Sequence, residues 1–341
     1  MDSTQRRIGV IIPSYKSGES IRWTLDSIAA QRRRPDEVCV VFDGEDPVGE
    51  AIARDHAVVT EVIVREECSG GAAQPRNDGW NRIGRRVDYI HFLDSDDLIS
   101  PSFYATLSQS LDANSGLVGV KVRSQAMLDE EIYKNEGFSG WDQLDELRSG
   151  EIEEVRLENS PETWLPFSFS LLRSESVASL EIDGGPWRGR RSEVSSGKQE
   201  YMEDTDFAFR LVASGRYGLV AGQGGIYVVR KGSVSDSMAK TYLWMWRAFE
   251  LAIVPWAERQ NDVRILRIAQ KMRSMSVRKY ARTERNFRIA MMVLLRDLMR
   301  RPRAKTVAAI TLFLLGVDPQ RKRSLSQTRS HRKTPSKLRK E

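Results

Sequence analysis

The chain contains little cysteine. Among its 341 residues there are two, Cys39 inside an apolar run and Cys68 in a glycine-rich loop. Two cysteines cannot build a disulfide framework or a four-ligand zinc site, so disulfide-stabilised scaffolds and structural zinc modules are excluded. This scarcity favours a reducing compartment, and we expect a cytoplasmic protein.

Long apolar runs are also lacking. The first run begins at Ile8 and ends at Pro13, which is too short for the apolar region of a signal peptide. Residues 304–317 are apolar, but roughly 20 such residues are needed to cross a bilayer. No glycine-rich, lysine-containing phosphate loop follows the first run. We therefore expect no export signal, no membrane-spanning helix and no Walker-type nucleotide site.

Charge, by contrast, is abundant and unevenly distributed. Residues 264–341 hold 23 Lys or Arg and four Asp or Glu, whereas the rest of the chain is acidic despite an overall net charge of +6. Such a basic region is attracted to phosphates on a membrane surface or a nucleic acid. We expect a helical basic extension over residues 241–317, either membrane-peripheral or packed on the rest of the protein. A disordered basic tail is expected over residues 318–341.

The remaining residues alternate between β-type and helix-type patterns. This order is typical of an α/β fold with a mostly parallel sheet and helices on both faces. The expected strands are residues 8–12, 38–42, 58–64, 89–93, 118–122 and 167–173, and the expected helices are 21–31, 72–86, 101–114 and 204–214. Residues 218–230 are expected to form two short strands about Gly224-Gly225, and residues 129–159 show no clear pattern.

An acidic cluster follows one expected strand directly. Asp94, Asp96 and Asp97 lie within four positions, and crowded carboxylates repel one another unless a cation lies among them. Oxygen ligands suit a hard divalent ion such as Mg²⁺ or Mn²⁺, with phosphate oxygens and water completing its coordination. The alternative is a turn that caps the following helix. In open α/β sheets, however, ligands bind beyond the carboxyl ends of strands, where this cluster and Asp43 both lie.

Five short motifs in order resemble those of family 2 glycosyltransferases with the GT-A fold. They are Val10-Ile11-Ile12-Pro13-Ser14-Tyr15, Asp43-Gly44, Pro75-Arg76-Asn77-Asp78-Gly79, Leu93-Asp94-Ser95-Asp96-Asp97 and Tyr201-Met202-Glu203-Asp204. They cover residues 8–235, so the basic C-terminal third lies outside the resemblance. The resemblance implies a Rossmann-like catalytic domain over residues 1–240. Its nucleotide-binding half is expected over residues 1–125 and its acceptor half over residues 126–240.

The resemblance also implies roles for individual residues. The residues implied to contact the nucleotide are Pro13, Ser14, Tyr15, Asp43, Arg76, Asn77, Asp94 and Ser95. Asp94, Asp96 and Asp97 are implied to hold a divalent metal, Mn²⁺ or Mg²⁺, against the diphosphate, which stabilises the leaving group. Asp204 is implied to be the general base on the acceptor hydroxyl, with Glu203 beside it.

The chain departs from the family pattern at two places. The family's histidine after the last core strand is replaced by Arg230-Lys231, whose cations are expected to meet the diphosphate directly. A long, arginine-containing stretch separates Trp187 from Glu203. We expect Trp187 either to stack on an acceptor sugar or to lie in the core.

Together these features predict an inverting enzyme that moves a sugar from a nucleoside-diphosphate sugar to a glycan, a lipid-linked or another hydroxyl acceptor. One alternative is another nucleotide-dependent α/β transferase, such as a nucleotidyltransferase. A second is a protein that binds nucleic acid or an anionic surface through its basic C-terminal region. The basic helices fit an anionic membrane surface at least as well as a nucleic acid. We therefore expect no nucleic-acid partner, and either contact of these helices with the inner face of the membrane or their packing on the catalytic domain.

Overall fold

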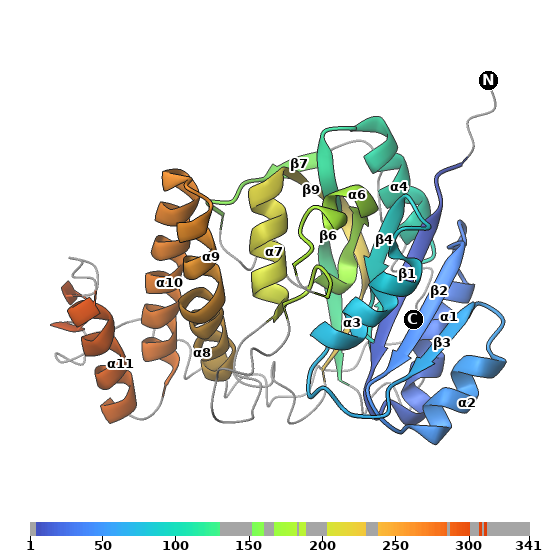
Figure 1. Ribbon diagram of the computed structural model, residues 1–341, viewed down its shortest axis with the longest axis horizontal. Helices are drawn as coiled ribbons and strands as arrows, with labels where there is room; N and C mark the ends of the chain where they lie inside the picture. Colours follow the sequence, from blue (N-terminus) through green and yellow to red (C-terminus); the bar gives the residue numbers. More distant parts are fainter. Residues whose placement is uncertain are drawn as a thin grey trace, which may run out of the picture. The chain divides into compact units, whose positions relative to one another are not determined.

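The computed structural model describes residues 5–129, 152–159, 167–182, 184–188, 203–229, 238–284 and 287–300, and residues 307, 308, 310 and 311. The chain divides into two units, which we call unit 1 (Met1–Lys231) and unit 2 (Gly232–Glu341) (Figure 1). Within the described ranges, no helix combines the length and the apolar content needed to cross a membrane.

Unit 1 is built on one sheet, whose first half is parallel. Strands β3, β2, β1 and β4 neighbour one another in that order, and all three pairings are parallel (Figure 1). Their bounds are β1 Ile8–Ser14, β2 Glu37–Phe42, β3 Glu61–Val64 and β4 Tyr89–Phe92. β1, β2 and β4 are buried along their whole length, as expected of strands covered on both faces.

Helices cover both faces of this parallel half. They are α1 Ile21–Ala29, α2 Pro47–Asp55, α4 Phe103–Ala113 and α3 Ala73–Gly79, which a π-helical turn Trp80–Gly84 continues. α1, α2 and α4 share one apolar core with Ile8, Val10 and Ile12 of β1. α3 packs on the other face, where a Cβ added at Gly79 would lie 2.5 Å from Ile11. Alternate β1 residues thus face two helical layers, which confirms the predicted α/β class.

The second half of the sheet is mixed. β4 is followed by β8, β6, β9 and β5, and β7 pairs with β9. β6 and β9 run parallel, whereas the other pairings in this half are antiparallel. The elements are β5 Leu98–Ile99, β6 Leu117–Asp129, β7 Ile152–Val155, a short 3-10 turn Phe167–Phe169, β8 Ser170–Arg173, α6 Ser174–Ala178, α7 Glu203–Ser214 and β9 Arg216–Val229.

Residues 216–229 form one strand, so the prediction of two short strands about Gly224-Gly225 is wrong. The two glycines allow strands to approach closely and do not make a turn. A Cβ at Gly225 would lie 2.5 Å from the carbonyl oxygen of Leu98 in β5, and one at Gly224 would lie 2.2 Å from Val122 in β6. Only a residue without a side chain fits between such neighbours.

Helix α2 is missing from the sequence prediction, although its start carries a signal. The side chain of Asp46 accepts a hydrogen bond from the N–H of Gly49 at 3.1 Å, and Pro47 is the first helical residue. An acidic cap followed by proline is a common helix start. β5, β7 and α6 are also missing from it, because elements of two to five residues are too short to show a periodicity.

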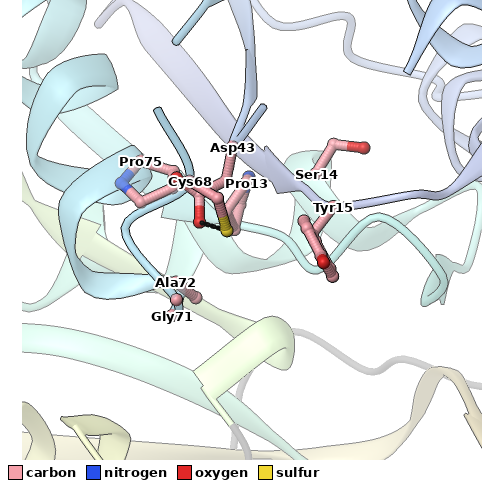
Figure 2. A pocket seen from close by; sticks show the side chains of 9 residues that line it. Pro13, Ser14, Tyr15, Asp43, Cys68, Gly71, Ala72 and Pro75 are labelled. Carbon is pink, nitrogen blue, oxygen red and sulfur yellow. Dashed lines mark hydrogen bonds between the residues drawn. The ribbon is translucent and has the colours of Figure 1, made fainter. Parts of the chain in front are cut away.

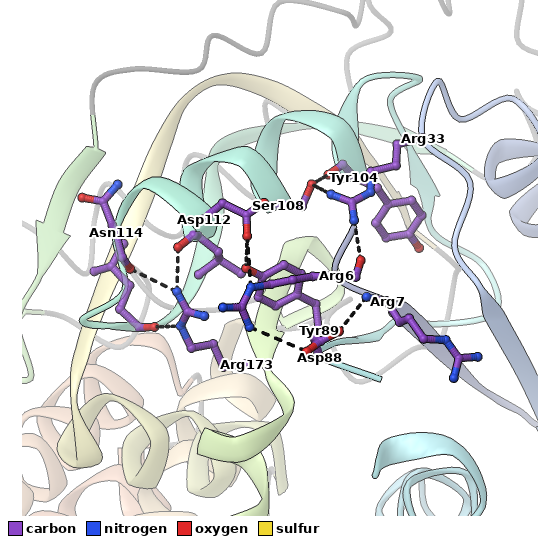
Figure 3. Close-up of polar contacts among 12 residues, drawn as sticks. Arg6, Arg7, Arg33, Asp88, Tyr89, Tyr104, Ser108, Asp112, Asn114 and Arg173 are labelled. Atoms are coloured by element: carbon purple, nitrogen blue, oxygen red, sulfur yellow. Dashed lines mark hydrogen bonds and ion pairs between the residues drawn. The ribbon is translucent and has the colours of Figure 1, made fainter. Parts of the chain in front are cut away.

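Arg173 joins the end of β8 to the end of α4 (Figure 3). Its guanidinium donates to the carbonyl oxygens of Leu111 at 2.6 Å, Leu117 at 2.8 Å and Asn114 at 3.2 Å. The last turn of a helix leaves carbonyls without helical partners, and Arg173 satisfies some of them. Its Cζ also lies 5.6 Å from the ring centroid of Tyr89 in β4. Arg173 therefore fastens the mixed half of the sheet to the parallel half.

Unit 2 is helical in the part described. Its elements are α8 Met238–Ala248, a π-helical turn Phe249–Ile253, α9 Val254–Arg259, α10 Val263–Thr283 and α11 Phe287–Arg300. Trp246 of α8 and Leu294 of α11 belong to one small apolar core. Arg273, which is 3% exposed, donates to Glu250 and to Asp297 at 2.6 Å each. This buried cation links α10 to the π-helical turn and to α11.

Candidate functional site

A pocket opens at the carboxyl ends of β1 and β2 (Figure 2). It has a volume of about 390 Å³ and is lined by Pro13, Ser14, Tyr15, Asp43, Cys68, Gly70, Gly71, Ala72 and Pro75. Four of the residues expected to contact a nucleotide, Pro13, Ser14, Tyr15 and Asp43, thus share one cavity. Its volume suits a small ligand, and ligands of open α/β sheets bind beyond the carboxyl ends of parallel strands.

The carboxylate of Asp43 holds the loop that lines one side of this pocket (Figure 2). Oδ1 accepts from the N–H of Ser69 at 2.8 Å, and Oδ2 accepts from the Ser69 hydroxyl at 2.9 Å and the Cys68 thiol at 3.3 Å. Nε of Arg65 lies 3.0 Å from Oδ1. Since Asp43 is 3% exposed and beside a cation, it is a fixed, charged acceptor at the pocket wall.

Arg76, in α3, brings together acidic residues that are far apart in the sequence. Its guanidinium donates to Oδ1 of Asp94, just after β4, at 2.7 Å and to Oδ1 of Asp204, at the start of α7, at 2.6 Å. Glu203 lies 3.5 Å from the nitrogen that binds Asp204. The side chain of Arg76 is 4% exposed, whereas those of Asp94 and Asp204 are 34% and 28% exposed. The expected metal ligand and the expected base therefore share one buried cation.

Burial controls the protonation of this cluster. Burial, followed by the charge of Asp204, raises the pKa of Glu203 to about 7, and Arg76 acts against this shift. Burial also raises the pKa of Asp204 above its usual range, again opposed by Arg76. The pKa of Arg76 is raised, because the carboxylates of Asp204 and Asp94 outweigh the effect of burial. A carboxylate with a raised pKa accepts a proton more readily, which suits Asp204 to general base catalysis.

Asn77 and Trp187 join α3 to the turn formed by residues 184–188. Nδ2 of Asn77 donates to the carbonyl oxygen of Trp187 at 2.7 Å, and its Oδ1 accepts from the Trp187 N–H at 2.9 Å. Both polar atoms of the Asn77 side chain are thus engaged with the backbone. Neither Arg76 nor Asn77 is among the residues that line the pocket of Figure 2. Arg76 instead contacts Asp204 at the start of α7, and Asn77 contacts the turn of residues 184–188.

The indole of Trp187 lies in the protein core. Its ring is nearly parallel to that of Phe207, with centroids 4.0 Å apart, and Cζ of Arg76 lies 4.3 Å from the indole centroid. Trp187 is 2% exposed, so neither face of the indole is open to a sugar. This burial supports the core alternative and not the expected stacking on an acceptor. The indole stabilises the guanidinium of Arg76 through a cation–π contact.

Asp206 anchors the start of α7, two residues after Asp204. It is fully buried and accepts from Nε of Arg188 at 2.7 Å and Nε of Arg210 at 3.1 Å. Arg210 also donates to the carbonyl oxygen of Pro186 at 2.6 Å. These contacts fasten the turn of residues 184–188 onto α7, the helix that contains Asp204. They could not be predicted from the sequence.

Asp97 occupies a different environment from Asp94. It is 1% exposed, and its Oδ1 accepts from the N–H of Val228 in β9 at 3.2 Å. Burial, with the charges of Asp96 and Asp94, raises the pKa of Asp97 well above its usual range. Its burial argues against the expected metal contact and indicates that Asp97 ties the acidic turn to β9. Asp94, Ser95 and Asp96 are partly exposed.

Asp94 and Asp96, the two acids that remain, can hold a metal ion only if a substrate supplies further ligands. In the part of the chain that the structure describes, no three His, Cys, Asp or Glu side chains are grouped to hold a metal ion. Asp94 and Asp96 are left as partly exposed carboxylates. Mg²⁺ is commonly bound by one or two carboxylates and by phosphate oxygens of the substrate. The chemistry of these two residues thus fits an ion shared with a diphosphate.

Some site residues were not predicted, and some predicted ones lie outside the described residues. Arg65, which pairs with Asp43, and Cys68, which lines the pocket, gave no signal beyond a glycine-rich loop. The contact of these residues with Asp43, which follows β2, depends on the fold and cannot be predicted from the spacing of residues in the sequence. Arg230 and Lys231, expected at the diphosphate, lie outside the described residues.

Comparison with known proteins points to one family. The family model described as "Glycosyl transferase family 2" matches residues 9–180, half of the chain. Glycosyltransferase GlyA of Streptococcus pneumoniae is 32% identical over 106 residues, which are 31% of this chain and 15% of that protein. The chain therefore corresponds to a small part of this relative's length.

Solved structures extend the likeness to most of the chain. S. aureus TarS 1–349 in complex with UDP-GlcNAc has a TM-score of 0.53 at 17% identity, and the match covers 90% of both chains. The mannosyltransferase PcManGT from Pyrobaculum calidifontis, in complex with GDP-Man and Mn²⁺, has a TM-score of 0.52 at 15% identity. That match covers 94% of this chain and 83% of PcManGT. At these identities the likeness concerns the fold alone, and it agrees with the GT-A-like fold expected from the motifs.

Proposed function

The chain belongs to glycosyl transferase family 2, and we propose that it moves a sugar from a nucleoside-diphosphate sugar to a hydroxyl acceptor, with inversion at the anomeric carbon. The observation that carries this proposal is the bridge that Arg76 makes between Asp94 and Asp204. Asp94 follows β4 in the parallel half of the sheet, and Asp204 is the second residue of α7, which belongs to the other half. Carboxylates held on either side of one cation suit a reaction in which one bound substrate displaces the leaving group of another.

We assign the nucleoside to the pocket that Pro13, Ser14, Tyr15 and Asp43 help to line. Asp43 shapes this pocket by holding Cys68 and Ser69, and we propose that an N–H or O–H group of a base or ribose exchanges with the long Cys68 contact to its carboxylate. Tyr15 is 54% exposed and offers a ring at the pocket wall. The two solved neighbours bind UDP-GlcNAc and GDP-Man, which supports a nucleotide-sugar donor.

A divalent ion, Mn²⁺ or Mg²⁺, belongs to this proposal, with Asp94 and Asp96 as its protein ligands and the diphosphate as the remaining one. When bound, such an ion neutralises the charge that builds on the departing nucleoside diphosphate. PcManGT, which is solved with Mn²⁺, supports a metal in this fold. Arg76 adds a second positive charge beside Asp94, and we propose that it holds this carboxylate in position.

We assign Asp204 as the general base. Its carboxylate is partly exposed, so an acceptor hydroxyl can reach it, and its raised pKa favours proton uptake. As Asp204 takes the hydroxyl proton, the acceptor oxygen bonds to the anomeric carbon and the bond to the diphosphate oxygen breaks on the opposite face. Glu203 lies beside Asp204, and because burial raises its pKa to about 7, near neutral pH it adds less negative charge than an ordinary carboxylate would.

The acceptor is proposed to be a glycan, a lipid-linked or another hydroxyl compound. Residues 1–240 are proposed to be the catalytic domain, with the acceptor half beyond about residue 125, and residues 241–317 a basic extension. We further propose that the enzyme acts in the cytoplasm at the inner face of the membrane, because the extension combines positive charge with apolar side chains.

A panel of nucleoside diphosphates and nucleotide sugars tests the proposal. Each compound is added with Mn²⁺, with Mg²⁺ or with a chelator, and the thermal unfolding midpoint is recorded. We expect one nucleotide class to raise the midpoint by several degrees, because a ligand of the native state stabilises it. The metal-dependent part of this shift is expected to vanish in Asp94→Asn. If no nucleotide raises the midpoint under any metal condition, the proposal is wrong.

A further inference from the structure

Three large apolar side chains lie exposed on one side of α11. Met292 is 61% exposed, Leu295 is 43% exposed and Met299 is 78% exposed. Spacings of three and four residues place them along one helical face, and we call them the α11 stripe. Val293 and Leu294, which fall on other sides of the helix, are buried in the core of unit 2. The exposure of the stripe is therefore a property of a folded, amphipathic helix.

Grouping distinguishes this stripe from other exposed apolar residues of unit 2. Leu251 is 43% exposed and Val263 is 65% exposed, and Met238 and Val307 are exposed too, but these four residues are far apart in the sequence. Isolated apolar residues are common on the surfaces of soluble proteins, whereas grouped ones mark interaction sites. α11 has 14 residues, fewer than the roughly 20 needed to span a bilayer. The stripe thus suits contact with a surface and not insertion across one.

The charge of this part of the sequence selects the kind of surface. The sequence of α11 includes Arg288 and Arg296, while its one acidic residue, Asp297, is buried against Arg273. Residues 264–341 hold 23 Lys or Arg against four Asp or Glu. A nucleic acid would satisfy these cations but would leave the apolar stripe in water. An anionic bilayer satisfies both, because apolar side chains enter the acyl boundary while cations contact lipid phosphates.

We propose that the α11 stripe docks unit 2 onto the surface of an anionic lipid bilayer. Met292, Leu295 and Met299 enter the boundary between headgroups and acyl chains, and the basic residues of the unit contact the headgroups. The purpose of this docking rests on the proposed function, because an acceptor carried in the membrane would meet an enzyme held at the membrane surface. The lipid contact itself requires no catalysis.

Co-sedimentation of the full chain with vesicles tests this docking. One set of vesicles is equimolar phosphatidylglycerol and phosphatidylcholine, and the other is phosphatidylcholine alone. We expect the partition coefficient to be at least about tenfold higher for the anionic vesicles and to fall as salt is added. The triple variant Met292→Ser, Leu295→Ser, Met299→Ser is expected to lose about tenfold in partitioning to anionic vesicles.

A double variant, Leu251→Ser with Val263→Ser, is the matched control, because it removes exposed apolar side chains outside the stripe. It is expected to partition like the unchanged protein. Equal binding of the unchanged protein to both vesicle types overturns the proposal. Normal binding of the triple variant to anionic vesicles also overturns it. A lower unfolding midpoint or a changed oligomeric state of that variant would then make the stripe a protein contact.

Donor binding in the same preparations separates this inference from the proposed function. The triple variant is expected to keep the nucleotide-dependent rise of its unfolding midpoint in the absence of vesicles. Loss of lipid binding with nucleotide binding intact is the result that supports docking by the stripe. A protein that binds anionic vesicles through the stripe but responds to no nucleotide would overturn the proposed function and leave the docking surface standing.

Discussion

Arg76 donates to the carboxylate of Asp204 across 2.6 Å, although 128 positions separate the two residues in the chain. The same guanidinium binds Asp94 at 2.7 Å, so α3 connects the end of β4 with the start of α7. A buried cation shared by several carboxylates keeps them close in spite of their mutual repulsion. In our proposal, this arrangement holds the donor side and the acceptor side of one reaction together.

Arg76→Met is expected to lower the free energy of unfolding by about 3 kcal/mol, because it leaves Asp94, Glu203 and Asp204 crowded without their cation. Urea unfolding measures the change. Arg85→Met is the control: it also breaks a 2.6 Å pair, with Glu181, but the side chain of Arg85 is 73% exposed. That control is expected to cost less than about 1 kcal/mol. Equal costs for the two variants would contradict a structural role for the Arg76 bridge.

Gly185→Ala is expected to be more costly than Gly184→Ala. Both glycines have positive φ, +145° and +92°, so either alanine strains the backbone. A Cβ at Gly185 would also lie 2.5 Å from Oδ1 of Asn77, whereas nothing lies within 4 Å of one at Gly184. Asn77 cannot yield without breaking its bonds to Trp187. We expect about 1 kcal/mol for Gly184→Ala and about 2–4 kcal/mol for Gly185→Ala, measured by urea unfolding.

Glu203 is expected to make stability depend on pH. Its pKa is raised from 4.5 to about 7 by burial and then by the charge of Asp204, so folding favours the protonated form. The resulting stability is fully present below pH 4.5 and is lost as pH rises to about 7. Glu203→Gln stays neutral, so above pH 7 it is expected to exceed the unchanged protein in stability by on the order of 1–3 kcal/mol.

Urea unfolding of both proteins at several pH values between about 4.5 and 8 measures this difference, which is expected to shrink towards the acid end. Other titrating groups affect both proteins alike and cancel in the comparison. Parallel stability curves across this range would show that Glu203 titrates normally.

Asp43→Asn is expected to weaken nucleotide binding by at least about tenfold, because the variant loses the charge of the acceptor at the pocket wall. Isothermal titration with the nucleotide found by the panel measures the affinity. Asp26→Asn provides a control, since the side chain of Asp26 is 57% exposed and pairs with His56 outside the pocket-lining residues. Unchanged affinity in Asp43→Asn would remove Asp43 from the donor site.

The parallel half of the fold could be predicted from the sequence. The runs at β1, β2 and β4 are largely apolar because both faces are covered, and those at β1 and β2 are rich in Val or Ile. The mixed half is harder to predict, because β5 has two residues and β9 contains glycines that resemble a turn. Those glycines are explained only by the neighbouring carbonyl of Leu98 and the side chain of Val122.

The family could be predicted as well, and the match to residues 9–180 confirms it. The order of the motifs also pointed to Pro13, Ser14, Tyr15 and Asp43, which line one pocket. It could not show that Trp187 is covered by Phe207, or that Asp97 bonds to Val228 in β9. Such contacts join distant segments, and the sequence around each residue carries no trace of them.

Asp204 is proposed to remove the acceptor proton, and sugar transfer by Asp204→Asn measures that role. An amide keeps the size of the side chain and a hydrogen-bond acceptor for Arg76, but it cannot take up a proton at neutral pH. We expect donor affinity to stay within about twofold, while turnover falls roughly 10²–10⁴-fold, the usual contribution of a general base. Turnover equal to that of the unchanged protein would show that Asp204 is not the base.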